Sequence, residues 1–220
     1  IEAYYEKAQF TDWTHAISQA PMVKLQHPDY EVYLTGIHAY RNVACADCHM
    51  PYRSEGGVKF TDHYIQSPLL NIANSCAVCH RWSEEEIRSR VESIQDKTRE
   101  VRQRVEEALV KAHFDTAAAM QAGAKDDELQ LPRDLIRKAQ LRWDFVAANN
   151  GMGFHSPGEC LRILAASLDL ASQARTELAR VLASHGVIKP VIYPDTSTKM
   201  AAQAVEQSFV KGNPPELLPK

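Results

Sequence analysis

The sequence predicts a mainly α-helical protein in which a loop-rich segment, residues 1–82, precedes long helices. The first segment is dense in Tyr, His, Pro and Gly and shows little periodicity, whereas residues 83–187 repeat apolar side chains at helical spacing. A third segment, residues 188–220, contains several prolines and is expected to form an extended arm. We expect the three segments to be parts of one domain.

The composition is that of a globular chain. Of 220 residues, 45% are hydrophobic and 24% are charged, which is enough apolar material for a substantial core. No apolar run reaches the roughly 18 residues that a membrane-spanning helix needs, so we expect a soluble chain. The formal net charge of -3 provides no basic surface for phosphate groups. Nucleic acid is therefore not an expected partner.

One long helix is predicted to begin at Ser83. Ser83 and Glu86 have the spacing of a capping box, in which each side chain bonds the backbone N–H of the other residue. Apolar residues then recur at alternating intervals of four and three as far as Ala112, and Gly123 is expected near the helix end. This heptad pattern is typical of a structural helix.

Two further helices follow in the middle segment. Pro132 is expected in the first turn of the second helix, which continues to the Asn-Asn-Gly sequence at residues 149–151. The third helix is predicted to begin after Ser156, with Pro157 in its first turn, and to end at Gly186.

Two copies of one short motif lie in the first segment, in the stretches VACADCHMPY and SCAVCHRW. Each copy places two cysteines three positions apart and a histidine directly after the second cysteine. The motif residues are Cys45, Cys48 and His49 in the first copy and Cys76, Cys79 and His80 in the second.

Four interpretations compete for this doubled motif. A zinc site could use both cysteine pairs, but their separation exceeds that of zinc ribbons and zinc requires no histidine after each pair. A redox-active pair needs a strand-to-helix context, and structural disulfides leave the histidines unexplained. Covalent haem explains every residue type, because the two thiols form thioethers with the porphyrin and the histidine binds iron. The sequence therefore predicts two haem c groups, which would also supply apolar area to the loop-rich segment.

The remaining cysteine and histidines divide into ordinary and candidate functional residues. Cys160 lies in an apolar helical context and is expected to be an inert buried thiol. The histidines outside the motifs exceed what two bis-histidine haems need, which leaves ligands for haems bound elsewhere. They are His15, His27, His38, His63, His113, His155 and His185.

The ordered set of motifs resembles the pentahaem cytochrome c nitrite reductases, a family of periplasmic enzymes that form ammonia. The resemblance extends over nearly the whole chain, and its most specific parts are KLQHP, GIH, CADCHMP, TDH, CAVCH and FHSP in that order. A single Cys-x-x-Cys-His motif would indicate only a c-type cytochrome. The resemblance implies a multihaem cytochrome c fold, in which long helices form a homodimer interface.

The chain differs from that family in one large respect. Family members carry five haems, and one of them is attached to a Cys-x-x-Cys-Lys motif whose lysine-bound iron binds nitrite. The present sequence contains neither that motif nor two other haem sites, and it begins at Ile1 without a start Met or a signal peptide. It therefore resembles the C-terminal half of such an enzyme, and the active haem with its lysine ligand is expected in a missing N-terminal half.

The resemblance also implies a ligand set for each haem. The first motif would hold one haem with His155 as its second axial ligand, and the second motif would hold another with His38. His63 of the TDH sequence would reach a haem whose other ligand lies outside this chain. His15, His113 and His185 receive no assigned role.

A catalytic pocket and a calcium site are implied beside these haems. His27 of KLQHP resembles the histidine that faces nitrite, and an imidazole can donate a proton to an anionic nitrogen oxide near neutral pH. Lys24, through its carbonyl, and Gln26, through its side chain, resemble two ligands of a calcium ion. The implied metal ligands in this chain are Lys24 and Gln26 for calcium, and His38, His49, His63, His80 and His155 for haem iron.

The implied reaction is the six-electron reduction of nitrite to ammonium in the periplasm, with a membrane-anchored or soluble cytochrome c as electron donor. Bis-histidine haems have no open iron position and can only relay electrons. Two alternatives remain: a multihaem c-type electron-transfer protein without catalysis, and an octahaem relative that processes nitrite or hydroxylamine.

Overall fold

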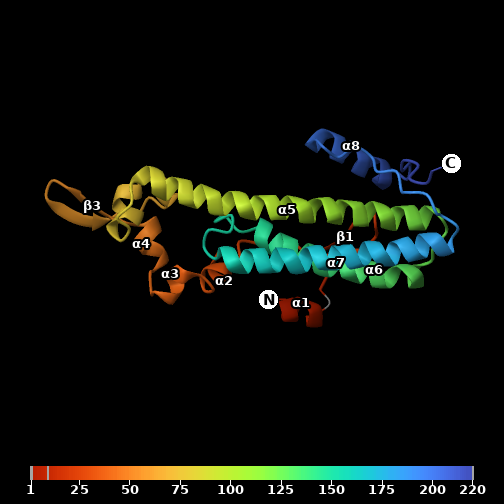
Figure 1. Ribbon diagram of the computed structural model, residues 1–220, viewed down its shortest axis with the longest axis horizontal. Coiled ribbons are helices and arrows are strands. Elements are labelled where there is room, and N and C mark those ends of the chain that lie inside the picture. Colours follow the sequence, from red (N-terminus) through yellow and green to blue (C-terminus); the bar gives the residue numbers. More distant parts are fainter. Residues whose placement is uncertain (1, 9, 220) are drawn as a thin grey trace. The chain divides into compact units, whose positions relative to one another are not determined.

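The computed structural model describes residues 2–8 and 10–219 (Figure 1). Helices form most of this part of the chain, and the strands make two short antiparallel hairpins. The longer helices are α5 (Glu84–Gln121), α6 (Asp126–Ala147), α7 (Pro157–Ser184) and α8 (Lys199–Val210). The shorter ones are α1 (Glu2–Ala8), α2 (Asp29–Tyr33), α3 (Ile37–Tyr40), α4 (Cys45–His49), η1 (Pro68–Leu70), η2 (Ile72–Asn74) and η3 (Cys76–Val78).

The chain divides into two compact units that do not follow the three predicted segments. The helical unit consists of Ile1–Gln26, Val101–Ala148 and Arg162–Lys220. The motif unit consists of His27–Glu100 and Asn149–Leu161. Helices α5 and α7 therefore contribute residues to both units.

Three helices build the core of the helical unit. The C-terminal part of α5 packs with α6 and α7, as the Trp143 Nε1 hydrogen bond to Glu106 (3.1 Å) and the Ser167 Oγ hydrogen bond to the Ala139 carbonyl (2.6 Å) show (Figure 1). The small hairpin of β1 (Trp13–Thr14) and β2 (Pro21–Met22) lies against α6. Fully buried side chains from this unit are Met22, Val105, Phe114, Leu129, Ile136, Val146, Leu164, Leu178 and Leu217.

Two of the predicted helix boundaries are confirmed. At the start of α5, Ser83 N–H donates to Glu86 Oε2 (3.0 Å) and Glu86 N–H donates to Ser83 Oγ (3.2 Å), which is a complete capping box. At the end of α7, Gly186 has a φ of 80° and Val187 N–H donates to the carbonyl of Leu182. This pattern is a Schellman motif, for which glycine is the favoured residue.

The predicted start of the second helix is wrong. Helix α6 begins at Asp126, so Pro132 lies inside the helix rather than in its first turn. The actual start is stabilised by the Glu128 carboxylate, which accepts from the Lys125 backbone N–H (2.8 Å). The interior proline removes one backbone hydrogen bond, but its ring is buried in the core of the helical unit.

The prediction of an extended C-terminal arm is wrong for Lys199–Val210, which forms α8. Thr198 caps this helix, because its Oγ1 accepts from the Ala201 N–H (3.1 Å). The segment before α8 is extended and is attached to the helical unit by Tyr193, whose hydroxyl donates to Asp115 (2.7 Å). Arg175 completes this cluster with a hydrogen bond from Nε to Asp115 (2.8 Å).

The motif unit is loop-rich, as the sequence predicts, and it buries few apolar side chains. Its hairpin of β3 (Tyr52–Glu55) and β4 (Val58–Thr61) is exposed at nearly every position. The buried aliphatic side chains of this unit are Val32, Ile72, Ile87 and Val91. Its exposed large apolar side chains are Tyr30, Leu34, Ile37, Tyr40, Tyr52, Val58, Phe60, Tyr64, Ile65, Leu70, Val78 and Trp82. Such an excess of exposed apolar surface indicates that a further group or chain covers it.

Candidate functional site

The first cysteine motif forms the single helical turn α4. Asp47 stabilises its start, because Oδ2 accepts from the Ala44 N–H (2.7 Å). A helical turn brings side chains three positions apart to one face, so Cys45 and Cys48 lie on the same side. Burial raises the pKa of the Cys48 thiol to about 11, and the thiol of Cys76 in the other motif adds to this shift. The two motifs are therefore close together.

The second motif adopts a comparable turn around η3. The backbone N–H groups of Cys79 and His80 both donate to the Cys76 carbonyl, at 3.2 and 2.9 Å. The ring of Trp82 stacks on His80 with a centroid distance of 5.2 Å and an interplanar angle of 10°. The turn thus holds both cysteines and the histidine within five consecutive residues, with the imidazole packed on Trp82.

All five cysteines of the chain are free thiols, so neither motif contains a disulfide. A raised thiol pKa, as at Cys48, is opposite to the low pKa that makes Cys-x-x-Cys pairs redox-active. Among the described residues, no group of three or more His, Cys, Asp and Glu side chains is arranged to hold a metal ion. The leftover Cys160 is fully buried, as predicted, and burial raises its pKa to about 11.

His49 of the first motif faces His155, and their ring centroids lie 6.3 Å apart with an interplanar angle of 63°. The Nδ1 atom of His49 lies 3.0 Å from the Gln66 carbonyl oxygen. Because a carbonyl can only accept, Nδ1 carries the proton, and Nε2 keeps a lone pair. His49 is thereby prepared to bind a metal through Nε2.

His80 of the second motif faces His38 of α3, again with a centroid distance of 6.3 Å and with an interplanar angle of 87°. The ring of Phe154 also lies near His38, with a centroid distance of 5.9 Å and an interplanar angle of 32°. Burial lowers the pKa of His38, and the neighbouring His80 lowers it further. A neutral imidazole is the form that binds a metal.

The equal spacing of these two ring pairs fits a metal between the rings. When two imidazoles bind one metal ion from opposite sides, their ring centroids lie about 6 Å apart, because each metal–nitrogen bond is about 2 Å long. The cysteines that precede one histidine of each pair are free thiols, and many large apolar side chains of the motif unit are exposed. Both features also suit a porphyrin. The residues present therefore fit two haem c groups.

Two glycines make room for His155. A Cβ atom on Gly36 would lie 1.9 Å from the His155 carbonyl oxygen, and one on Gly151 would lie 2.7 Å from His155 Nδ1. Burial lowers the pKa of His155, while the carboxylate of Asp29 opposes that shift. Nδ1 of this ring is buried without a hydrogen-bond partner, and Asp29 Oδ1 is 3.7 Å away, which is too far for a hydrogen bond.

His27, the candidate catalytic residue, is exposed and has a positive φ of 48°. Its Nδ1 lies 3.2 Å from Asn150 Nδ2. Asn150 in turn bonds Asp29, which also accepts from the Gly151 N–H (3.2 Å). The polar residues Asp29 and Asn150 were not identified from the sequence, although HPD and NNG mark the two loops that carry them.

The other sequence-predicted residues are placed as follows. Lys24 donates from its backbone N–H to Asp12 (2.8 Å), and its ammonium group pairs with the buried Asp144. Gln26 is exposed. His63 is also exposed and belongs to neither histidine ring pair.

A further pair of histidines lies in the helical unit. His15 and His113 stack with a centroid distance of 3.7 Å and an interplanar angle of 14°. The buried His113 has its Nδ1 2.8 Å from Ser18 Oγ. This stack holds both rings face to face and presents no shared position for a metal.

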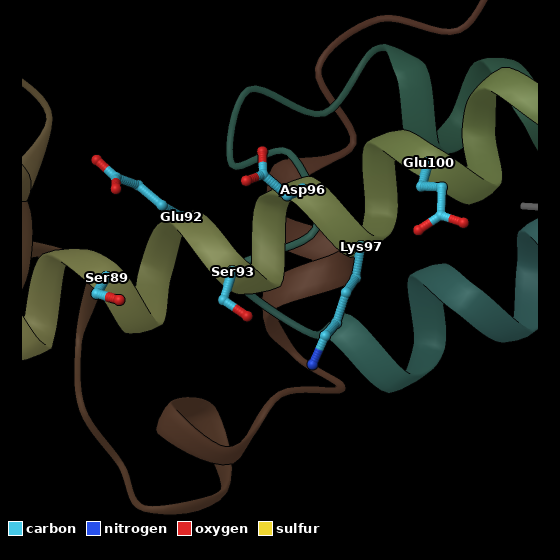
Figure 2. Close-up of a pocket in the computed structure, with 6 residues that line it drawn as sticks. All are labelled: Ser89, Glu92, Ser93, Asp96, Lys97 and Glu100. Atoms are coloured by element: carbon cyan, nitrogen blue, oxygen red, sulfur yellow. The ribbon is translucent and has the colours of Figure 1, made fainter.

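A shallow hollow lies along α5, lined by Ser89, Glu92, Ser93, Asp96, Lys97 and Glu100 (Figure 2). All six side chains come from one helix, and Figure 2 shows them pointing to both sides of it. The hollow contains none of the motif residues. It is a charged helix surface rather than a reaction site.

Paired histidines beside Cys-x-x-Cys turns, on a mainly α scaffold, define a multihaem c-type cytochrome. The chain belongs to the cytochrome c552 family, which it matches over residues 1–214. Covalently bound haem c is the cofactor that this membership implies. No helix in the described ranges has the length and apolar character needed to cross a membrane.

Named relatives agree with this assignment. The cytochrome c-552 of Bacteroides fragilis (strain YCH46) is 53% identical over 203 residues, covering 92% of this chain and 41% of the relative. That of Bacteroides thetaiotaomicron is 48% identical over 231 residues, covering 100% of this chain and 47% of the relative. The chain thus spans less than half the length of these relatives.

A solved structure is also similar. The cytochrome c nitrite reductase from Desulfovibrio desulfuricans ATCC 27774, a catalytic subunit with two calcium sites, superposes with a TM-score of 0.71 at 33% identity. The match covers 80% of this chain and 38% of that subunit.

Proposed function

We propose that this chain is part of a periplasmic cytochrome c nitrite reductase, in which it holds two bis-histidine relay haems and the histidine beside nitrite. The observation that carries the proposal is the pair of ring spacings, His49 to His155 and His38 to His80, both 6.3 Å. The similarity to a cytochrome c nitrite reductase supports the choice of reaction.

The ring pairs suit electron relay. The two histidines of each pair would hold one haem, which would leave its iron no position for substrate, and bound haem c would supply reversible one-electron transfer. The chain's part is to hold the four imidazoles in fixed positions through α3, α4, the turn at η3 and the turn before α7. His63 would serve a haem outside this chain, which its exposure allows.

His27 is proposed to act on nitrite directly. Its imidazole is exposed, and the contact with Asn150 orients the ring. A donor of this kind can hydrogen-bond an anionic nitrogen oxide and deliver one of the protons that ammonium formation requires. The lysine-ligated active haem would lie outside this chain.

Calcium is proposed to bind beside that pocket through the carbonyl of Lys24 and the side-chain oxygen of Gln26. Hard cations prefer such oxygen ligands, and the D. desulfuricans subunit has two calcium sites. The ammonium group of Lys24 pairs with Asp144, which reduces its repulsion of a cation.

Three features of the whole enzyme are proposed together with the nitrite reductase function. The protein would be a homodimer with long helices such as α5 at the interface. A membrane-anchored or soluble cytochrome c would donate electrons. Thioether haem attachment is chemistry of an oxidising, exported compartment, which supports the periplasm.

A second candidate is a multihaem electron-transfer protein. The observation that favours it is that both ring pairs use two histidines, so this chain builds no open iron site of its own. The two candidates differ in one assay: only a reductase forms ammonium from nitrite when an artificial electron donor is supplied.

The His27→Ala variant of the haem-loaded whole enzyme, which includes the active haem, tests the catalytic assignment. All haems should remain attached and the bis-histidine relay haems should remain low-spin, because His27 is proposed to bind no iron. Nitrite turnover should fall by about 10²–10⁴-fold, the usual contribution of a general acid.

His155→Ala and His38→Ala serve as the contrasting variants. Each removes a proposed axial ligand and should produce a high-spin haem signal. Full turnover in His27→Ala together with a new high-spin signal would show that His27 is a ligand and that the assignment is wrong.

A further inference from the structure

Asp29, the first residue of α2, lies at the centre of a polar cluster in the motif unit. Oδ2 accepts from the backbone N–H and the side-chain amide of Asn150, at 3.3 and 3.2 Å. Oδ1 accepts from the Gly151 N–H at 3.2 Å. The side chain is only 26% exposed, so these three donors fix the carboxylate in place.

One face of this carboxylate is turned to His155. Nδ1 of His155 is buried and has no hydrogen-bond partner, and Asp29 Oδ1 is 3.7 Å away. If Nε2 of His155 binds iron, Nδ1 must carry a proton, and a buried N–H without an acceptor is unfavourable. A carboxylate has acceptor positions to spare, and a shift of well under 1 Å would make the bond.

The same carboxylate is connected to His27. Because Asp29 can only accept, the Asn150 atom that contacts it must be the amide nitrogen, and this fixes the orientation of the amide. The second amide hydrogen can then reach His27 Nδ1 at 3.2 Å. His27 therefore accepts at Nδ1 and keeps its proton on Nε2, the donor available to a ligand.

We propose that Asp29 is a positioning residue shared by the axial histidine His155 and the candidate catalytic histidine His27. It accepts from Nδ1–H of His155, and through Asn150 it holds His27 as an Nε2–H donor. This inference rests on the proposed function, since it takes His155 as a haem ligand. A carboxylate behind an axial imidazole makes the ligand more basic, which favours the oxidised iron and lowers its reduction potential.

The test replaces Asp29 with Asn in the haem-loaded whole enzyme. The amide oxygen still accepts one hydrogen bond, but the negative charge is lost. The midpoint potential of one haem should rise and its low-spin electron paramagnetic resonance signal should shift, while the other haems keep both values. The signal that becomes high-spin in His155→Ala identifies the haem concerned. Nitrite turnover should also fall, because His27 loses its fixed orientation.

Glu31→Gln is the matched control. Glu31 is exposed, lies two positions further along the same helix, and its replacement removes the same charge. Neither the potential nor the signal should change in this variant. Asp29→Glu, which keeps a carboxylate, should return the potential towards that of the unmodified protein.

Two results would overturn the inference. The first is an Asp29→Asn protein with the same potential and signal as Glu31→Gln. The second is loss of the haem from both Asp29→Asn and Asp29→Glu, since the carboxylate would then only hold the loop. An unmodified protein without haem would instead contradict the proposed function.

Discussion

At the scale of single residues, the candidate site depends on positions where a side chain would be too large. Gly36 touches the His155 backbone so closely that no Cβ atom fits. Gly151 leaves the space into which the His155 ring extends. Two residues that have no chemistry of their own therefore leave the space that the backbone and the ring of His155 occupy.

Gly36→Ala should displace His155 and destabilise the motif unit. The added methyl group would meet the His155 carbonyl oxygen at 1.9 Å, and such overpacking costs typically 1–3 kcal/mol. We expect a lower thermal midpoint and a high-spin signal from one haem. Gly158→Ala is the control, because a Cβ atom there meets nothing within 4 Å. Equal stability and equal spectra for the two variants would contradict the close contact.

The stacked pair of His15 and His113 predicts a loss of stability in acid. Burial lowers the pKa of His15 from 6.5 to about 4 and that of His113 well below its usual value. Above pH 6.5 both rings are neutral in the folded and unfolded states. As the pH falls towards 4, the unfolded chain binds protons that the folded chain does not, so stability decreases, by up to about 2 kcal/mol near pH 5 for His15.

The measurement is the free energy of unfolding in denaturant at about pH 7.5 and about pH 5. His15→Phe keeps an aromatic ring on His113 but removes one titrating group, so it should lose less stability on acidification than the unmodified protein. The same acid sensitivity in both proteins would show that this stack does not titrate as inferred.

At the scale of elements, sequence signals located those helix ends that are made by local contacts. The capping box at Ser83 and the glycine at 186 both act within a few residues of the helix end, so the sequence reveals them. The start of α6 was missed because Lys125 is not a usual capping residue, and Pro132 appeared to be the start signal. Helix α8 was missed because the prolines around it suggested an extended chain.

Tyr193→Phe should loosen the segment that leads to α8. The hydroxyl donates to the buried Asp115, and the pKa of Tyr193 is raised to about 12 by its burial and by that carboxylate. Losing the bond leaves Asp115 with Arg175 as partner and should cost about 1–2 kcal/mol. Hydrogen exchange should become faster around residue 193 and in α8. Unchanged exchange there would mean that other contacts attach the segment.

At the scale of the whole molecule, the two units differ in what stabilises the interior of each. The helical unit has an ordinary core of interlocking aliphatic side chains, whereas the motif unit exposes many large apolar residues and buries few. Covalent haem would cover that surface. The loop-rich composition of residues 1–82 predicted this difference for residues 27–82, because a segment without a periodic apolar pattern cannot build a core from side chains alone, whereas residues 1–26 join the helical unit.

The candidate site was accessible to sequence analysis only in part. The cysteines and the histidines that follow them are adjacent in the chain, so their chemistry can be inferred from spacing. The partners His38 and His155 came from the family resemblance, since no local pattern connects them to His80 and His49. Asp29 and Asn150 carry no motif, and their contacts depend on how two distant loops fold together.

The central claim is that each Cys-x-x-Cys-His turn carries one covalent haem. Trypsin should release residues 42–53 and 60–81 as separate peptides, because each is bounded by Lys or Arg and contains one motif. Mass spectrometry of these two peptides from the haem-loaded protein should find one haem on each, with no free thiol. Both peptides recovered without haem, whether as thiols, as disulfides or with bound zinc, would contradict the account.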